Sequence, residues 1–174
     1  MINTFVKPIL VLTAICLVVS GALAYVSSIT TPIINAADSE RAYIAMNEKI
    51  PNATGFETIN LADYNDMPKT IKQAYRTSND VGNIFIAAIN GFSGDITIIC
   101  AINSTGEIMA VSTLSHTETQ GIGTIIEQEP FLDTFKGIDQ NLAGVDTVTG
   151  ATVTTRAFIH AVEDVMTAFW IINN

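Results

Sequence analysis

Three β-branched runs in the middle of the chain decide the fold: "NIFIAAI" (residues 83–89), "DITIICAI" (95–102) and "EIMAVSTL" (107–114). The linkers between them, "NGFSG" and "NSTG", contain the residues that favour turns. Short runs of this kind bounded by turn residues are typical of strands, and they predict an antiparallel meander. Both faces of the central run are largely apolar, so we expect helices to cover the sheet on at least one side.

An amphipathic pattern follows the strands, from Thr155 to about Ile171. Its apolar positions recur at helical spacing: Phe158, Val162, Val165 and Phe169. This spacing predicts a helix that packs on the sheet. Shorter helices are expected at 38–50, 68–75 and 130–135. The order of helices, strands, loop and helix predicts an α+β domain with an antiparallel sheet packed by helices.

The N-terminal part of the chain has no charge between Lys7 and Asp38. Within it, Ile9 to Ile29 is dominated by Ile, Leu, Val and Ala, enough to span a bilayer as one helix. The alternative is a signal peptide cut after Ala22 or Ala24. The apolar core of a signal peptide is about 7 to 15 residues long, which is shorter than this run and favours an uncleaved anchor.

Charge predicts the orientation and excludes some partners. Lys7 precedes the span, so the N-terminus is expected in the cytoplasm and the C-terminal domain outside. The residues after the span carry 7 basic and 17 acidic side chains, a balance of −10, which disfavours nucleic acid as a partner. The chain has two cysteines, Cys16 and Cys100. It has no cluster of Cys and His residues of the kind that would predict a metal or iron–sulfur site.

We divide the chain into an N-terminal transmembrane anchor (1–34), a helix with a connecting segment (35–80) and a domain core (81–174). A short exit segment is expected between the span and the helix that begins near residue 38. Only 14% of the residues are charged, well below the roughly 25% of soluble domains, and the anchor accounts for much of this deficit.

The entrance to the last helix, "DTVTGATVTTRAF" (146–158), is rich in threonine around one glycine. Unpaired N–H groups and the dipole at a helix N-terminus favour anions, and Gly150 permits a close backbone approach. The residues alone leave three alternatives open. One threonine is an ordinary N-cap while the others fill a turn, or the entrance binds a phosphate without a covalent bond, or a hydroxyl carries a ligand.

The loop "SHTETQGIG" (115–123) follows the third run and contains two glycines spaced by one residue. Glu118, Thr119 and Gln120 offer donors and acceptors that suit a flat heteroaromatic ring. The alternative is an ordinary surface turn, in which His116 is solvated. The chain has no GxSxG, HExxH, Walker A or GxGxxG motif in the required context, and we assign no catalytic residue.

Together the two stretches resemble the FMN-binding domain family. Asp146 to Thr152 matches its flavinylation motif, D-x-x-[ST]-G-A-T, and His116 to Gly123 is similar to its upstream H-x-E-T-P-G-L-G. Thr149 stands where serine is commoner, which keeps the hydroxyl. Gln120 and Ile122 replace the usual Pro and Leu.

The resemblance implies FMN joined through its phosphate to Thr152 by a phosphoester, which a flavin transferase installs outside the membrane from FAD. It implies four further cofactor-binding residues around the attachment point, namely Asp146, Thr149, Gly150 and Ala151. Glu118 and Thr119 are expected at the flavin ring. Arg156 either pairs with the phosphate or is an ordinary solvated helix residue.

The order and spacing of these features are similar to those of the G subunits of Rnf-type ferredoxin:NAD⁺ oxidoreductases. This implies an electron-transfer component of an ion-translocating complex in the cell (inner) membrane of a prokaryote. The partners would be other membrane subunits of that complex, and this chain alone would not be a complete enzyme. Two alternatives remain. One is a flavinylated component of another outward-facing respiratory complex, such as a sodium-translocating NADH:quinone oxidoreductase, and the other is a flavin-free, membrane-anchored interaction domain.

Overall fold

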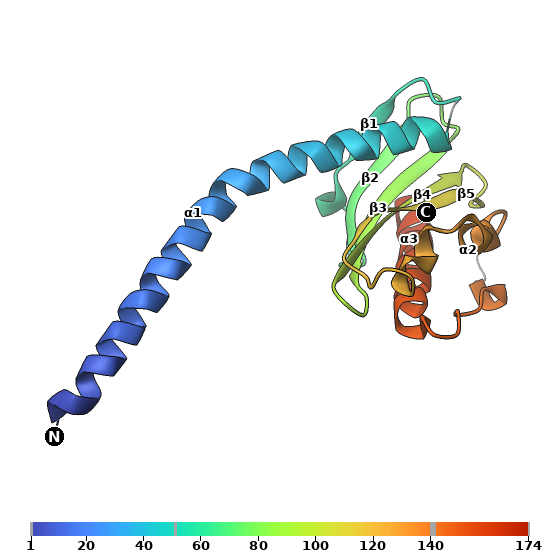
Figure 1. Cartoon of the computed structure of the whole chain (residues 1–174). Helices are drawn as coiled ribbons and strands as arrows, with labels where there is room; N and C mark the ends of the chain where they lie inside the picture. Colours follow the sequence, from blue (N-terminus) through green and yellow to red (C-terminus); the bar gives the residue numbers. More distant parts are fainter. Residues whose placement is uncertain (1, 51, 140–141, 174) are drawn as a thin grey trace. The chain divides into compact units, whose positions relative to one another are not determined.

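The computed structural model describes residues 2–50, 52–139 and 142–173 and contains two compact units, Met1–Glu40 and Arg41–Asn174. Figure 1 shows the elements. The helices and strands are α1 (Ile2–Lys49), β1 (Phe56–Ile59), β2 (Ile71–Thr77), β3 (Gly82–Asn90), β4 (Asp95–Asn103), β5 (Ile108–His116), α2 (Glu129–Leu132) and α3 (Thr152–Asn173). Short 3₁₀ turns lie at Leu61–Asp63, Gly123–Glu127, Asp133–Phe135 and Leu142–Gly144.

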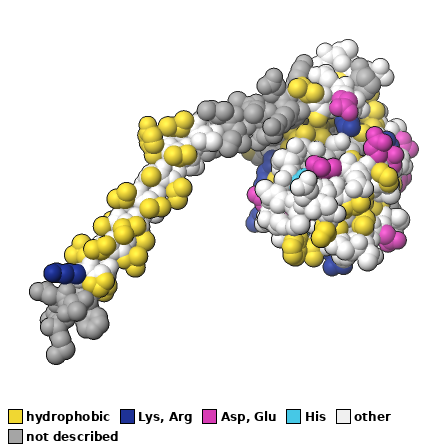
Figure 2. All heavy atoms as spheres, viewed as in Figure 1, with side chains coloured by type: hydrophobic (Ala, Val, Ile, Leu, Met, Phe, Trp, Pro, Cys, Tyr) yellow, Lys and Arg dark blue, Asp and Glu magenta, His cyan; other side chains and the backbone are white. Residues whose placement is uncertain are grey.

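The first unit is helical and contains one segment, Lys7–Thr30, that is long and apolar enough to cross a membrane. Its side chains are exposed around the whole helix, and Figure 2 shows apolar groups following one another along it. A helix that is apolar on every side requires an apolar environment. The segment therefore agrees with the predicted span in position and length.

Helix α1 is continuous from Ile2 to Lys49. The prediction of a non-helical exit segment before residue 38 is therefore wrong. The helix that we expected to begin there is the C-terminal part of α1, and it ends before Pro51 as predicted. Pro32 and Asn35 are poor helix formers and suggest a break, yet α1 continues through both of them.

The second unit contains a five-stranded antiparallel sheet with the order β1-β2-β3-β4-β5. Each strand pairs with the next in the chain, so the predicted meander is confirmed as β3, β4 and β5. The prediction that both faces of the central run are apolar is confirmed too, because its residues contribute to two buried clusters. Ile96, Ile98, Cys100 and Ile102 belong to one buried cluster, and Ile99 and Ala101 belong to the cluster on the opposite face.

Helices cover both faces of this sheet, as the apolar β4 required. Helix α3 packs on the first face through its buried stripe, Phe158, Val162, Val165 and Phe169. Met46 and Ile50, at the C-terminal end of α1, pack on the other face within the second unit. The predicted short helix near residue 130 is present as α2 and the 3₁₀ turn that follows it. The α+β fold class is thereby confirmed.

One element was predicted with the wrong type. We expected a short helix over 68–75, but Ile71–Thr77 is the strand β2. Its buried residues are Ile71, Ala74 and Thr77, a spacing of three that imitates a helix. The pairing register with β3 shifts between Ile71 and Gln73, and such a bulge disturbs the alternation that identifies a strand. The edge strand β1, four residues long, was not predicted.

Candidate functional site

The entrance to α3 is built by a glycine and a buried threonine. Gly150 has a φ of +90°, a conformation that favours glycine, and it turns the chain into the helix. Thr155 is fully buried, and its hydroxyl donates to the carbonyl of Ala151 (3.0 Å) and accepts from the N–H of Val148 (3.1 Å). Thr155 therefore holds the turn against the first helical turn.

Thr152 is the first residue of α3 and is only half-buried. Its hydroxyl lies 3.5 Å from the carbonyl oxygen of Val148, beyond the usual range of an O–H···O hydrogen bond. Because Thr155 makes the bonds that hold the turn, the Thr152 hydroxyl is left for another partner. It also lies at the helix terminus where free N–H groups favour a negative charge.

The loop after β5 is held by His116 and Glu118. Nδ1 of His116 accepts from the backbone N–H of Glu118 (3.0 Å), and Nε2 lies 3.0 Å from Oε1 of Glu127. The imidazole is only 10% exposed. The alternative in which His116 is solvated is therefore wrong, because the imidazole is buried and bonds its own loop.

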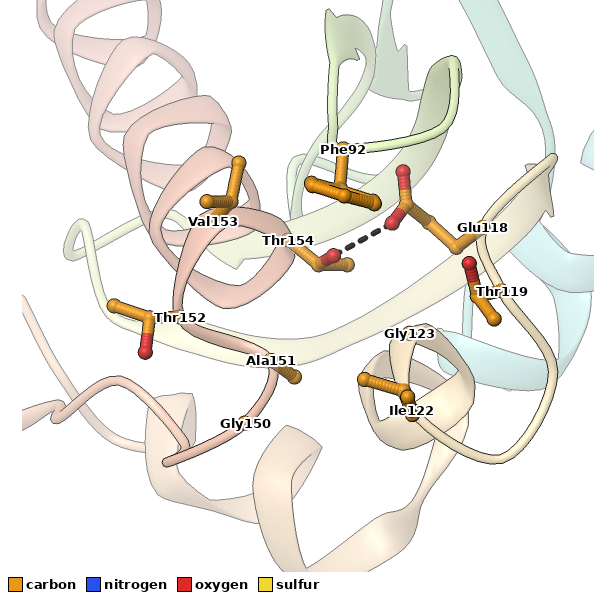
Figure 3. A pocket seen from close by; sticks show the side chains of 10 residues that line it. All are labelled: Phe92, Glu118, Thr119, Ile122, Gly123, Gly150, Ala151, Thr152, Val153 and Thr154. Carbon is orange, nitrogen blue, oxygen red and sulfur yellow. Dashed lines mark hydrogen bonds between the residues drawn. The ribbon is translucent and has the colours of Figure 1, made fainter.

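Both motifs line one cavity of about 300 Å³. Figure 3 shows the entrance of α3 on one side and the loop after β5 on the other, with the β3–β4 turn closing the space between them. The lining residues are Phe92, Glu118, Thr119, Ile122, Gly123, Gly150, Ala151, Thr152, Val153 and Thr154. Segments some 30 residues apart in sequence thus converge on a single site.

The cavity gathers five of the seven residues that we expected to bind the cofactor: Glu118, Thr119, Gly150, Ala151 and Thr152. Asp146 and Thr149 are not among the residues that line it. Arg156 is exposed and has no ion-pair partner in the described part of the chain. It lies four residues after Thr152 in α3, and residues with this spacing share one face of a helix.

Sequence reasoning missed the apolar rim of the cavity. Phe92, Ile122 and Val153 are 71%, 56% and 55% exposed, and each comes from a different segment. An exposed aromatic residue inside the turn "NGFSG" was the available signal, because the other residues there are those that turns prefer. Three exposed apolar side chains around one opening favour a ligand with an apolar surface.

Glu118 is the charged residue of the cavity wall and is 8% exposed. Burial alone raises the pKa of this carboxyl. This effect of burial is outweighed by hydrogen bonds to the carboxylate, which come from the Thr154 hydroxyl and from the backbone N–H groups of Ser93, Phe92 and Gly94. The net pKa of Glu118 therefore lies below its ordinary value. The carboxylate is therefore ionised at neutral pH and fully engaged by the protein.

This low pKa predicts a pH-dependent contribution to stability. Because folding lowers the pKa, the contribution is complete above the unfolded value of about 4.3 and is lost as the pH falls through the folded value. We expect the difference in free energy of unfolding between the unmodified chain and Glu118→Gln to be constant above about pH 5 and to shrink below about pH 4. Urea unfolding of the full chain in detergent, followed by Trp170 fluorescence, measures it. A difference that grows as the pH falls would contradict the assignment.

A protein-family model described as "FMN-binding domain" matches residues 91–167 of the chain. This range includes the β3–β4 turn, the loop after β5 and most of α3, and therefore every residue that lines the cavity. The resemblance predicted from the two motifs is confirmed.

Similar proteins carry a more particular description. The G subunit of the ion-translocating oxidoreductase complex of Shewanella piezotolerans is 36% identical over 90 residues, an alignment that covers 44% of this chain and 42% of that protein. The protein of the same name from Shewanella baltica is 28% identical over 99% of this chain and 91% of its own length. The G subunit of the proton-translocating ferredoxin:NAD(+) oxidoreductase complex of Clostridium ljungdahlii is 23% identical over 88% of this chain and 85% of its own. The chain is thus similar to the Shewanella baltica and Clostridium ljungdahlii proteins along most of its length, but it spans less than half of the Shewanella piezotolerans protein.

Proposed function

We propose that this chain is the electron-transfer flavoprotein component of a membrane-bound, ion-translocating oxidoreductase complex of the Rnf type. The observation that carries the proposal is the cavity, where the weakly engaged hydroxyl of Thr152 at a helix N-terminus faces the same space as an exposed apolar rim. FMN has these two ends, a phosphate and a flat, largely apolar ring. The similarity to the G subunits of such complexes over most of the chain supports the assignment.

Thr152 is the attachment point in this proposal. Its oxygen attacks the phosphorus of the FMN half of FAD, the bond to AMP breaks, AMP leaves and the hydroxyl proton is released, with a flavin transferase as the catalyst. The resulting phosphodiester keeps one negative charge, which the N-terminus of α3 stabilises by about 0.3 to 1 kcal/mol. Arg156, on the same face of α3, supplies a positive charge for it.

Phe92, Ile122 and Val153 would hold the ring, with Thr119 also on the cavity wall. When bound, the flavin supplies one- and two-electron transfer. The chain's own residues hold it in place and shield one side from water, so no general base or nucleophile is needed. The attachment through Thr152 prevents loss of the cofactor to the exterior.

The division of the chain follows from this function. Residues 1–34 anchor the chain as a single-pass span with the N-terminus in the cytoplasm, residues 35–80 connect, and residues 81–174 present the flavin on the outer side of a prokaryotic cell membrane. The other membrane subunits of the complex pack against the exposed apolar side chains of Lys7–Thr30. Ferredoxin and NAD⁺ bind to other chains of the complex.

The test is direct. The full chain is expressed with a flavin transferase, denatured and examined for flavin fluorescence in the gel band, and the tryptic peptide 137–156 is fragmented to locate the modification. We expect a fluorescent band and FMN on residue 152. A dark band with an active transferase, or an unmodified peptide from the native membrane, would overturn the proposal. Co-purification with the other membrane subunits tests membership of the complex.

A further inference from the structure

The Glu118 side chain joins three segments of the second unit. Its Oε1 accepts from the backbone N–H of Ser93 in the β3–β4 turn (3.0 Å), and its Oε2 accepts from the hydroxyl of Thr154 in the first turn of α3 (2.6 Å). Glu118 itself belongs to the loop after β5. Figure 3 shows the carboxylate between these elements, with the bond to Thr154 drawn.

Two glycines make room for this side chain. A Cβ at Gly91 would overlap Oε1 of Glu118, and a Cβ at Gly123 would lie 2.5 Å from the Cβ of Glu118 and 3.0 Å from Oε2. Real side chains do not approach this closely, so larger residues at either position would displace the carboxylate. The second glycine of the loop motif is therefore explained by the space that Glu118 needs.

Three residues that contact Glu118 are direct neighbours, in sequence, of the three residues of the apolar rim. Ser93 follows Phe92, Thr154 follows Val153, and Gly123 follows Ile122. The Glu118 side chain thus hydrogen-bonds two of the residues next to the rim and leaves no space for a side chain at the third. The rim side chains themselves are more than half exposed.

We propose that Glu118 is a positioning residue for the flavin, whose carboxylate sets the spacing of Phe92, Ile122 and Val153 and places a fixed negative charge on the wall of the cavity. This inference rests on the proposed function. It differs from the expectation that Glu118 hydrogen-bonds the ring, because both carboxylate oxygens are engaged by the protein. The buried carboxylate would repel the negative charge gained by a bound flavin on reduction, and would therefore disfavour the reduced form.

Two substitutions separate the spacing from the charge. Glu118→Gln keeps the shape and removes the charge, whereas Thr154→Val keeps the charge and removes one of the bonds that hold it. Thr154→Ser, which retains the hydroxyl, is the matched control. All three variants are prepared as the full chain in detergent, loaded by a flavin transferase, and compared at about pH 8, where the carboxylate is ionised.

We expect the flavin midpoint potential of Glu118→Gln to be more positive than that of the unmodified chain, and that of Thr154→Val to change less. In both variants the fluorescence anisotropy of the flavin should fall, and hydrogen exchange of the peptide that contains Ser93 should be about tenfold faster, because a hydrogen bond to a charged group is lost or weakened. Thr154→Ser should resemble the unmodified chain in all three measurements.

The outcomes distinguish this inference from the proposed function. A dark gel band from the unmodified chain overturns the proposed function and the inference with it. A fluorescent unmodified chain whose potential and anisotropy are the same in Glu118→Gln overturns the inference alone. If Glu118→Gln does not fold, equal anisotropy in Thr154→Val and Thr154→Ser overturns it.

Discussion

Replacing Thr152 by alanine is expected to abolish covalent flavin incorporation, so that the denatured band shows no fluorescence. Among the threonines of the helix entrance, Thr152 combines a weakly engaged hydroxyl, a place at the helix N-terminus and a position on the cavity wall. Thr154 and Thr155 are buried, and their hydroxyls are used by Glu118 and by the turn. In-gel fluorescence normalised to total protein measures the effect.

Thr149→Ala is the matched control for this prediction. Thr149 belongs to the same motif and carries the same functional group, but it is exposed and lies outside the cavity lining. We expect it to retain most of the fluorescence, and Thr152→Ser to retain part of it, since the hydroxyl remains. Undiminished fluorescence of Thr152→Ala would show that the flavin is attached to another residue.

Replacing Phe158 by alanine is expected to reduce the free energy of unfolding by about 3 to 5 kcal/mol, the usual cost of removing a buried phenylalanine. Phe158 is fully buried on α3. Its ring centroid lies 5.3 Å from that of Phe131 and 5.5 Å from that of Phe135. These contacts join α3 to the short helical segment 129–135. The cavity left by alanine therefore opens in the core between α3 and the sheet.

Urea unfolding of the full chain in detergent measures this change through Trp170, the single tryptophan. Val153→Ala on the same helix is the control, because its side chain is 55% exposed and its removal should change the free energy by less than about 0.5 kcal/mol. A loss below about 1 kcal/mol for Phe158→Ala would mean that the three rings are not packed together.

The parts of the fold that the sequence predicted are those with strong periodic patterns. Strands β3 to β5 consist of β-branched runs, and α3 repeats its apolar residues at helical spacing over 22 residues. The prediction failed at β2 because Lys72, Gln73 and Arg76 are good helix formers and a bulge removes the alternation. Pairing with β3, a contact invisible in the local sequence, determined its conformation instead.

The candidate site was predicted in part, for a similar reason. Motifs identified Glu118 and Thr152 because each lies in a short, specific pattern. Phe92 lies in neither motif, and only the β3–β4 hairpin brings it to the cavity. Five threonines lie near the helix entrance, and the sequence does not distinguish their roles. Only the structure shows that Thr155 holds the turn and that Thr152 does not.

The three segments that line the cavity are translated one after another, so the cavity is complete only when the last of them has been made. The hairpin with Phe92 is translated first and the Glu118 loop next, but the bond from Thr154 to Glu118 needs α3, which is translated after both. A nascent chain that stops before α3 has neither the acceptor hydroxyl nor the docked helix. If FMN is attached to Thr152 as proposed, the attachment would therefore follow the synthesis and docking of α3.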